Sequence, residues 1–274
     1  MRAEDVRVSP EWLRLREPAD AAARSTELAE RLGRHLTAAG RLVIHDLGGG
    51  NGAMGRWLAP RLPGPQHWVL HDRDAGLLEL AVADAPEPAA DGAAVTVEAR
   101  RSDVTRLAPV DLAGASLIVA SALLDMLTAD ELAGMLDACT VIGCRPMLIA
   151  LTVVGRVGLT PADPLDSRLA VAFNAHQRRS TTTGRLLGPD AVAAVVDELR
   201  GTGAALVVRP SPWRLDVAQA DLTAEWLGGW VAAACEQEPA LAAEAGAYRD
   251  RRLAQAAAGL LAVTVDHADL LVLP

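Results

Sequence analysis

The chain has 274 residues and a mass of 28.7 kDa, which excludes a marginal mini-protein and allows one large domain or two small ones. Apolar residues make up 51% of the sequence and aromatic residues only 3%, so the core must be built from Ala, Val and Leu. All 26 basic residues are Arg and 35 residues are acidic, giving a net charge of −9 that makes nucleic acid a poor partner.

The composition also bears on cellular location. The three cysteines (Cys139, Cys144 and Cys235) are odd in number and lack metal spacing, which indicates a reducing cytoplasm and no disulfide framework. The first five residues do not resemble a signal peptide, and no uncharged apolar stretch reaches the roughly 18 residues needed to cross a bilayer. We therefore expect a cytoplasmic protein with no membrane partner. The absence of Lys beside abundant Ala, Arg and Gly is typical of a GC-rich, bacterial genome.

Apolar runs of strand length alternate with segments of helical period along the chain. The predicted strands cover residues 41–47, 67–71, 94–99, 115–121, 145–154, 204–208 and 263–273. The predicted helices cover residues 18–39, 51–62, 74–83, 128–139, 222–235 and 241–260. Thr128 and Glu131 form a capping-box pattern, and Asn51 is a candidate cap for the helix that starts there. This alternation predicts an α/β fold with a doubly wound, mostly parallel sheet of seven strands.

Three segments do not fit the alternation. Residues 1–40 form an Arg-rich, amphipathic N-terminal segment, and residues about 155–188 and 221–260 interrupt the sheet domain, which we assign to residues 41–274. Long segments of this kind inside a compact domain are usually functional or disordered. We expect all three to form a helical cap over the carboxyl edge of the sheet.

A glycine-rich turn follows the first predicted strand, where residues 44–55 read I-H-D-L-G-G-G-N-G-A-M-G. Residues 50–55 satisfy the dinucleotide pattern G-x-G-x-x-G. Residues 46–52 satisfy acidic-x-G-x-G-x-G, which resembles the first motif of class I S-adenosylmethionine (SAM) methyltransferases. A pyrophosphate requires backbone N–H groups with no anion nearby, whereas the cationic, zwitterionic SAM accepts a carboxylate such as Asp46.

Two further acids follow the next strands. Asp72 ends the second predicted strand, where a carboxylate can bind ribose hydroxyls of either NAD or SAM. Asp103 follows the third strand, and the resemblance implies that it accepts a hydrogen bond from the adenine amino group while Val104 packs on the ring. Three carboxylates after three successive strands favour SAM. Asp72 as part of a helix N-terminus and Asp103 as a surface turn residue are the alternative interpretations.

The resemblance continues in the fourth strand and in the strand order. Residues 118–127 resemble the family's fourth motif, although they contain Leu-Asp-Met where many small-molecule members have His-His-Leu. The late terminal strand matches the family topology, in which the seventh strand lies antiparallel between the fifth and the sixth. The implied cofactor-binding residues are Asp46, Gly48, Gly50, Asn51, Gly52, Asp72, Arg73, Asp103, Val104, Ala120 and Ser121.

Candidates for acceptor chemistry lie in the expected cap and after the fourth strand. His176 is a candidate general base because histidine titrates near neutrality, and Asp125 is a candidate for accepting from or orienting the acceptor. The candidate substrate-binding residues are Phe173, Asn174, Arg178, Trp226 and Trp230. A surface or capping role for His176 and Asp125, a solvated Arg178 and ordinary packing of the two tryptophans remain alternatives. We predict no metal site, because the spacing of His, Cys and acidic residues does not match zinc motifs.

The sequence therefore predicts a SAM-dependent methyltransferase that acts on a small molecule at oxygen, nitrogen or carbon, with S-adenosylhomocysteine as product. The elaborated cap and the inferred source favour specialised metabolism, with a homodimer left open. Two alternatives remain. The G-x-G-x-x-G pattern allows an NAD(P)-dependent oxidoreductase, and the departure from the family's fourth motif allows a methyltransferase-fold protein that binds SAM without catalysis.

Overall fold

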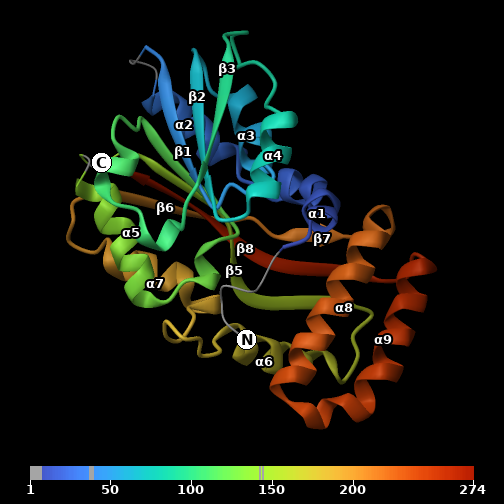
Figure 1. Cartoon of the computed structure of the whole chain (residues 1–274). Helices are drawn as coiled ribbons and strands as arrows, with labels where there is room; N and C mark the ends of the chain where they lie inside the picture. The colour runs from blue at the N-terminus through green and yellow to red at the C-terminus, as the bar shows by residue number, and fades with distance from the viewer. Residues whose placement is uncertain (1–7, 37–39, 142, 144) are drawn as a thin grey trace.

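The computed structural model describes residues 8–36, 40–141, 143 and 145–274 (Figure 1). Cys144, the first seven residues and the end of the predicted 18–39 helix lie outside the described residues. None of the described helices combines the length and apolar character needed to cross a membrane.

An eight-stranded sheet forms the centre of the molecule, with seven strands in the order β3-β2-β1-β4-β5-β8-β6 and β7 paired to β8. The strands are β1 (Leu42–Leu47), β2 (Gln66–Asp72), β3 (Val95–Arg101), β4 (Leu117–Ser121), β5 (Met147–Thr160), β6 (Ala205–Pro210), β7 (Trp213–Leu215) and β8 (Ala262–Leu273). Strands β1 to β5 pair in parallel, and β8 is antiparallel to both of its neighbours, β5 and β6. The predicted doubly wound sheet and its late antiparallel strand are confirmed.

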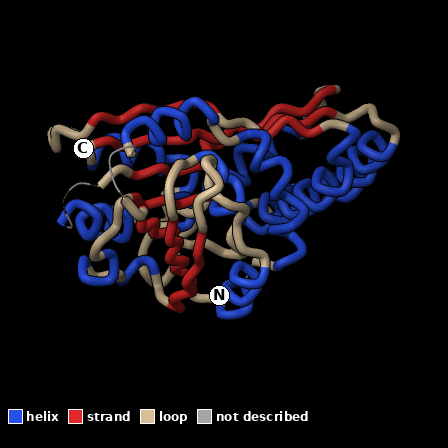
Figure 2. Tube along the Cα trace, turned by 90° about the horizontal axis from the view of Figure 1, so that it is seen from above, coloured by secondary structure: helices blue, strands red, loops and turns tan. Residues whose placement is uncertain are grey.

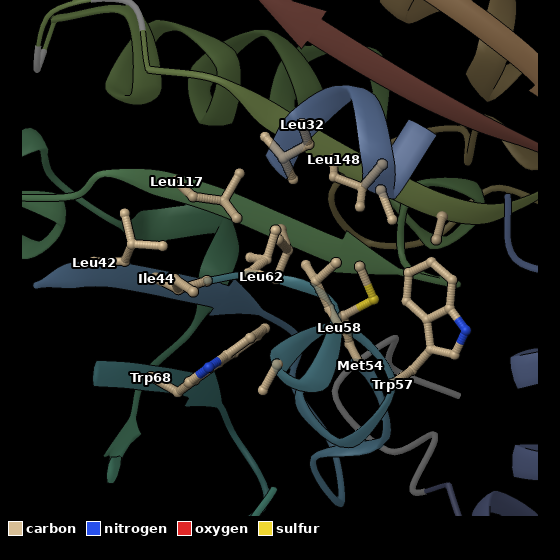
Figure 3. Packing of buried hydrophobic residues seen from close by; sticks show 14 of the residues in the cluster. Leu32, Leu42, Ile44, Met54, Trp57, Leu58, Leu62, Trp68, Leu117 and Leu148 are labelled. Atoms are coloured by element: carbon tan, nitrogen blue, oxygen red, sulfur yellow. The ribbon is translucent and has the colours of Figure 1, made fainter. Parts of the chain in front are cut away.

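Helices cover both faces of the sheet. They are α1 (Pro10–Ala23), α2 (Thr26–His35), α3 (Ala53–Leu58), α4 (Ala75–Ala83), α5 (Ala129–Val141), α6 (Asp166–Gln177), α7 (Ala191–Glu198), α8 (Ala220–Gln237) and α9 (Ala242–Ala257). One apolar core lies between the sheet and α2, α3 and α4, and a second lies between the sheet and α5 and α7. Figure 3 shows the first core, where side chains of α2 and α3 meet those of β1 and β4.

Strands β5 and β8 continue well beyond the rest of the sheet and carry a helical unit (Figures 1 and 2). The sequence predicts the end of β5 at residue 154, but the strand reaches Thr160, with register shifts that allow it to bend. The backbone of Leu151 is left-handed, with φ of 56°, at the first irregularity. Strand β7 pairs with β8 in this extended part, and a third apolar core joins the three strands to α1, α6, α8 and α9, so the cap has its own core.

The N-terminal segment forms two helices in place of the single predicted one. Helix α1 begins at Pro10, because the Ser9 side chain accepts a hydrogen bond from the Trp12 amide, and Pro18 lies inside the helix. Arg24 then leaves helical geometry and Ser25 caps α2. Helix α1 packs beside β7, where the Trp12 and Trp213 rings have centroids 6.3 Å apart (Figure 1).

Two predictions about helix caps have opposite outcomes. The capping box is confirmed: the Thr128 amide donates to Glu131 at 2.8 Å, and the Glu131 amide donates to the Thr128 hydroxyl at 3.2 Å. The prediction that Asn51 caps the next helix is wrong. Helix α3 starts after Gly52, whose left-handed backbone supplies the turn without a side-chain cap, and the Asn51 carbonyl accepts from Arg56 at 2.7 Å.

Candidate functional site

The glycine-rich turn joins β1 to α3 at the carboxyl edge of the sheet. Gly48, Gly50 and Gly52 all have left-handed backbones, with φ of 70°, 52° and 83°. The amides of Gly48 and Gly49 both donate to the carbonyl of His71 on β2, which fixes the start of the turn. A side chain would be strained at each of the three left-handed positions, so the sequence needs glycine there.

Neighbouring side chains also limit this turn. A Cβ atom at Gly48 would lie 3.1 Å from the Leu123 side chain, and one at Gly52 would lie 3.1 Å from the Ala81 Cβ. Both distances are tighter than ordinary contact. Glycine at these two positions therefore lets the turn pack closely against the segment after β4 and against α4.

The side chain of Asp72, at the end of β2, accepts a hydrogen bond from the glycine-rich turn. Its carboxylate accepts from the Gly50 amide at 2.9 Å through one oxygen and from the Asp74 amide at 2.9 Å through the other. Asp74 itself caps α4 by accepting from the Gly76 and Leu77 amides. Asp72 thus lies against the glycine turn, at the place where the sequence analysis expected an acid.

The carboxylate of Asp46 lies beneath the turn and has no hydrogen-bond partner among the described residues. The residue is 1% exposed, and both side-chain oxygens are buried and unpartnered. Burial raises the pKa of Asp46 to about 7, the charge of Asp72 adds to this shift, and the charge of Arg24 opposes it. An unpaired buried carboxylate is costly, so its presence at the end of β1 indicates a function other than stability.

Arg24 approaches the same region from the junction of α1 and α2. It is 3% exposed, and one guanidinium nitrogen donates to the Ser121 hydroxyl at the end of β4, at 3.1 Å. Its Nε and Nη1 atoms are buried and have no partner. The guanidinium carbon lies 5.6 Å from the centre of the Trp57 ring, a cation–π arrangement that holds its orientation.

Helix α1 covers the glycine-rich turn. Glu17 accepts two hydrogen bonds from Arg56 of α3, while Arg56 also donates to the carbonyls of Asn51 and Asp84. The side chain of Leu13 lies next to the turn: a Cβ atom placed on Gly50 would be 3.5 Å from it. The N-terminal helix is thereby fixed against the turn by polar and apolar contacts.

The remaining expected cofactor residues lie around the same edge. Asp103 follows β3 and accepts from the Thr105 amide and hydroxyl, with its side chain 48% exposed. Val104 packs against the second core, Ala120 is buried in it, and Arg73 directly follows β2. Their contacts with a cofactor remain predictions.

Asp125 lies in a 3-10 turn (Leu124–Met126) just after β4. Burial raises its pKa, opposed by a backbone hydrogen bond and by the charges of Arg16 on α1 and Arg179 after α6. Asp125 is nevertheless only partly shielded from solvent. Its role toward an acceptor remains a prediction.

His176 and its neighbours on α6 contact the cap itself. His176 Nε2 lies 3.4 Å from Glu236 on α8, and burial lowers its pKa. Asn174 donates to the Gly155 carbonyl at 2.7 Å, and Arg178 forms two 2.6 Å hydrogen bonds with Asp190. These three side chains therefore have structural contacts, and their proposed roles toward an acceptor remain predictions.

The aromatic candidates lie in the core of the cap. Trp226 and Trp230 are buried and stacked on each other, with ring centroids 5.3 Å apart. Phe173 is partly buried against the same core. Contact of these rings with a substrate remains a prediction. Among the described residues, no group of three or more His, Cys, Asp or Glu side chains is placed to hold a metal ion.

Comparison with solved structures places this arrangement among known folds. The cyclopropane synthase MmaA2 from Mycobacterium tuberculosis matches with a TM-score of 0.51 and 14% identity, over 97% of this chain and 95% of that one. The chain has the class I methyltransferase fold. Its glycine turn, Asp46 and Asp72 lie at the carboxyl ends of β1 and β2, where open α/β folds bind ligands.

Two further solved structures match this chain at lower TM-scores. A SAM-dependent methyltransferase from Thiobacillus denitrificans, solved with S-adenosyl-L-homocysteine, has a TM-score of 0.47 and 14% identity over 98% of this chain and 100% of that one. A SAM-dependent methyltransferase from Geobacter sulfurreducens, also with S-adenosyl-L-homocysteine, has a TM-score of 0.45 and 16% identity over 97% and 98% of the two chains. No protein-family model matches the chain, and no curated protein matches it.

Sequence reasoning missed Arg24, Arg16 and Glu17 among the residues at this edge of the methyltransferase fold. All three belong to the N-terminal segment, for which the sequence predicts a cap but no candidate site residue. The signal available was weak, because basic residues are abundant in the segment and are all Arg. Only the packing of α1 against the glycine turn distinguishes them from solvated arginines.

Proposed function

We propose that the protein is a SAM-dependent methyltransferase acting on a small-molecule acceptor. The observation that carries this proposal is the buried Asp46 carboxylate, which lies beneath a glycine-rich turn in a class I methyltransferase fold and has no hydrogen-bond partner in the described part of the chain. A ligand with a positive charge would supply the missing partner. SAM and its product S-adenosylhomocysteine both carry an ammonium group.

The residues of the turn fit this cofactor. Gly48, Gly50 and Gly52 allow close approach to the main chain, and Asp72 lies beside them at the end of β2 with lone pairs left for ribose hydroxyls. When bound, SAM supplies a methyl group activated by the sulfonium. The protein must then align the acceptor with that methyl group and exclude water.

An NAD(P)-dependent oxidoreductase fits the same turn less well. A pyrophosphate on the turn would add negative charge near Asp46, whose pKa is already raised by burial and by the charge of Asp72. The chain contains no Lys and only one Tyr, which excludes the Tyr-x-x-x-Lys type of oxidoreductase chemistry. No feature of the described site favours the dinucleotide.

Asp125 is the residue best placed to act on an acceptor. It follows β4 at the same edge as Ser121 and lies within electrostatic range of Arg16 and Arg179. A carboxylate with a raised pKa is a stronger base than an exposed one, which suits removal of a proton from a hydroxyl or amine. His176 remains a second candidate base.

Composition supports the finer parts of the proposal. The net charge of −9 favours a small acceptor over nucleic acid, and the cysteine pattern favours the cytoplasm. The inferred bacterial source and the elaborated cap favour specialised metabolism. Transfer to oxygen, nitrogen or carbon and a homodimeric state are left open.

Calorimetric titration of the purified chain with S-adenosylhomocysteine and, separately, with NAD tests the cofactor class. We expect micromolar or tighter binding of S-adenosylhomocysteine and none of NAD; tight NAD binding without a response to S-adenosylhomocysteine would overturn the proposal. A screen with methyl-labelled SAM against phenols, amines and carboxylates then separates an enzyme from a protein that only binds the cofactor.

A further inference from the structure

Asp46 and Arg24 are two buried, opposite charges that lie close enough to influence each other. Each alters the pKa of the other through its charge. The ion pairs found among the described residues do not include these two, so their charged atoms are more than 4.0 Å apart. Within residues 8–36, 40–141, 143 and 145–274, both oxygens of Asp46 and two nitrogens of Arg24 have no hydrogen-bond partner.

The other acids near Arg24 do not supply the missing partners. Asp20 binds Arg16 through both oxygens and accepts from the Trp213 indole at 2.9 Å. Asp269 accepts from the amides of Ser25 and Leu151, at 2.7 and 2.8 Å. The guanidinium of Arg24 is therefore held by Ser121 and Trp57, and its Nε and Nη1 atoms have no acceptor in the part of the chain that the structure describes.

A buried donor and a buried acceptor that both lack partners are unfavourable unless a ligand satisfies them. A molecule that satisfies both must present a cation to Asp46 and an anion to Arg24. An α-amino acid carries these two charges on adjacent groups, two bonds apart. The amino-acid end of SAM or S-adenosylhomocysteine has this chemistry, whereas the adenosine end carries no such charges.

We infer that Arg24 binds the carboxylate of the cofactor's amino-acid end while Asp46 binds its ammonium group. This inference rests on the proposed function and assigns a cofactor-binding residue to the N-terminal helical segment. Because Arg24 lies at the junction of α1 and α2 and contacts Ser121, the same side chain joins that segment, the end of β4 and the cofactor.

Three nucleoside probes separate the two charges in equilibrium titrations. S-adenosylhomocysteine carries both charged groups, decarboxylated S-adenosylmethionine keeps only the ammonium of the amino-acid end, and 5′-methylthioadenosine has neither. We expect Arg24→Met to weaken S-adenosylhomocysteine by about 10- to 100-fold and to leave the other two probes within about 2-fold of wild type. Asp46→Asn should weaken the first two probes and spare 5′-methylthioadenosine.

Arg14→Met is the matched control, because Arg14 lies on α1 with its side chain 58% exposed and pairs with Glu11. It should leave all three affinities unchanged. Retained binding of 5′-methylthioadenosine by the Arg24 and Asp46 variants shows that the site is folded. If an Arg24 variant no longer binds 5′-methylthioadenosine, the three titrations are repeated with Arg24→Lys, which keeps the charge. Partial recovery of S-adenosylhomocysteine binding relative to 5′-methylthioadenosine supports the inference.

The possible failures are distinguishable. If wild-type protein binds none of the three probes, the proposed function is wrong. If wild-type protein binds S-adenosylhomocysteine but the Arg24 variants weaken all three probes equally, or weaken none, the assignment of Arg24 is wrong and the proposed function stands.

Discussion

Glu17 on α1 accepts hydrogen bonds of 2.7 and 2.6 Å from Arg56 on α3, which connects the N-terminal helix to the helix that follows the glycine-rich turn. The two side chains are 25% and 17% exposed, so solvent screens them less than a surface pair. Arg56 also donates to the Asn51 carbonyl within the turn. The position of α1 and the shape of the turn are therefore coupled.

Glu17→Gln should loosen this connection. We expect a loss of about 1 kcal/mol in the free energy of unfolding, because one partner of a partly buried, two-bond ion pair is removed. Hydrogen exchange of residues 10–23, measured by mass spectrometry, should be faster in the variant than in the wild-type protein, while exchange in the sheet stays the same. Glu11→Gln is the control, since Glu11 and Arg14 lie 3.8 Å apart and are exposed. Equal exchange in both variants would contradict the role of Glu17.

Asp46→Asn should make the free protein more stable while it weakens cofactor binding. The pKa of Asp46 is raised to about 7 in the folded state, above its ordinary value of 3.8. A group with a raised pKa contributes stability at low pH that is lost as pH rises through the folded value. Wild-type protein should therefore be less stable than the variant at pH 8, by roughly 1–3 kcal/mol, with the difference shrinking toward pH 5. Urea denaturation at both pH values measures this, and a difference independent of pH would show that Asp46 is not the titrating group.

Asp125→Asn should slow methyl transfer more than His176→Ala does. Asp125 lies directly after β4, whereas His176 lies 3.4 Å from Glu236 within the cap. If Asp125 removes a proton, its replacement lowers kcat by about 100-fold or more and leaves S-adenosylhomocysteine affinity unchanged. Steady-state rates on an identified acceptor decide between them. Full activity of both variants would remove both residues from the list of bases.

The buried histidine pair of β1 and β2 should make the fold sensitive to acid. His45 Nδ1 and His71 Nε2 share a 2.9 Å hydrogen bond, and burial lowers the pKa of each to about 4. Between about pH 6.5 and 4 these two histidines bind more protons in the unfolded chain than in the folded one, so their contribution to stability falls as pH falls. The slope is roughly 1 kcal/mol per pH unit for each histidine.

His71→Gln should remove one histidine's share of this slope between pH 4.5 and 6. The opposing contribution of Asp46 is present in both proteins and cancels in the comparison. Chemical denaturation across this range measures the two slopes, and parallel curves would contradict the prediction. His35→Gln, at an exposed position in the last turn of α2, is the control and should keep the wild-type slope.

Features set by short stretches of sequence could be predicted. The Thr128 capping box, the glycine turn and the strand order each follow from patterns within a few residues or from the alternation of elements. The extension of β5 beyond residue 154 could not, because Gly155 interrupts the apolar pattern that marks a strand. Helix α7 and strand β7 are short, and pairing with the rest of the sheet domain defines them.

The site was predicted where it depends on the order of strands and missed where it depends on packing. Asp46 and Asp72 follow successive strands, so topology brings them to one edge. Arg24 and Ser121 form a hydrogen bond although they are 97 residues apart in the sequence, so no local sequence pattern could predict this contact. The same holds for Glu17 and Arg56, whose pairing depends on how α1 crosses the turn.

The position of Arg24 also changes how the chain can be divided. The domain boundary predicted between residues 40 and 41 places every recognised motif in the sheet domain and places the α1–α2 junction, with Arg24, in the N-terminal segment. A shortened chain beginning at residue 41 would keep the glycine turn and all three acids, yet would leave Asp46 without its cationic neighbour and open Trp57 to water. A motif search confined to the sheet would find every motif in such a fragment, although the fragment lacks Arg24, the cationic residue next to Asp46.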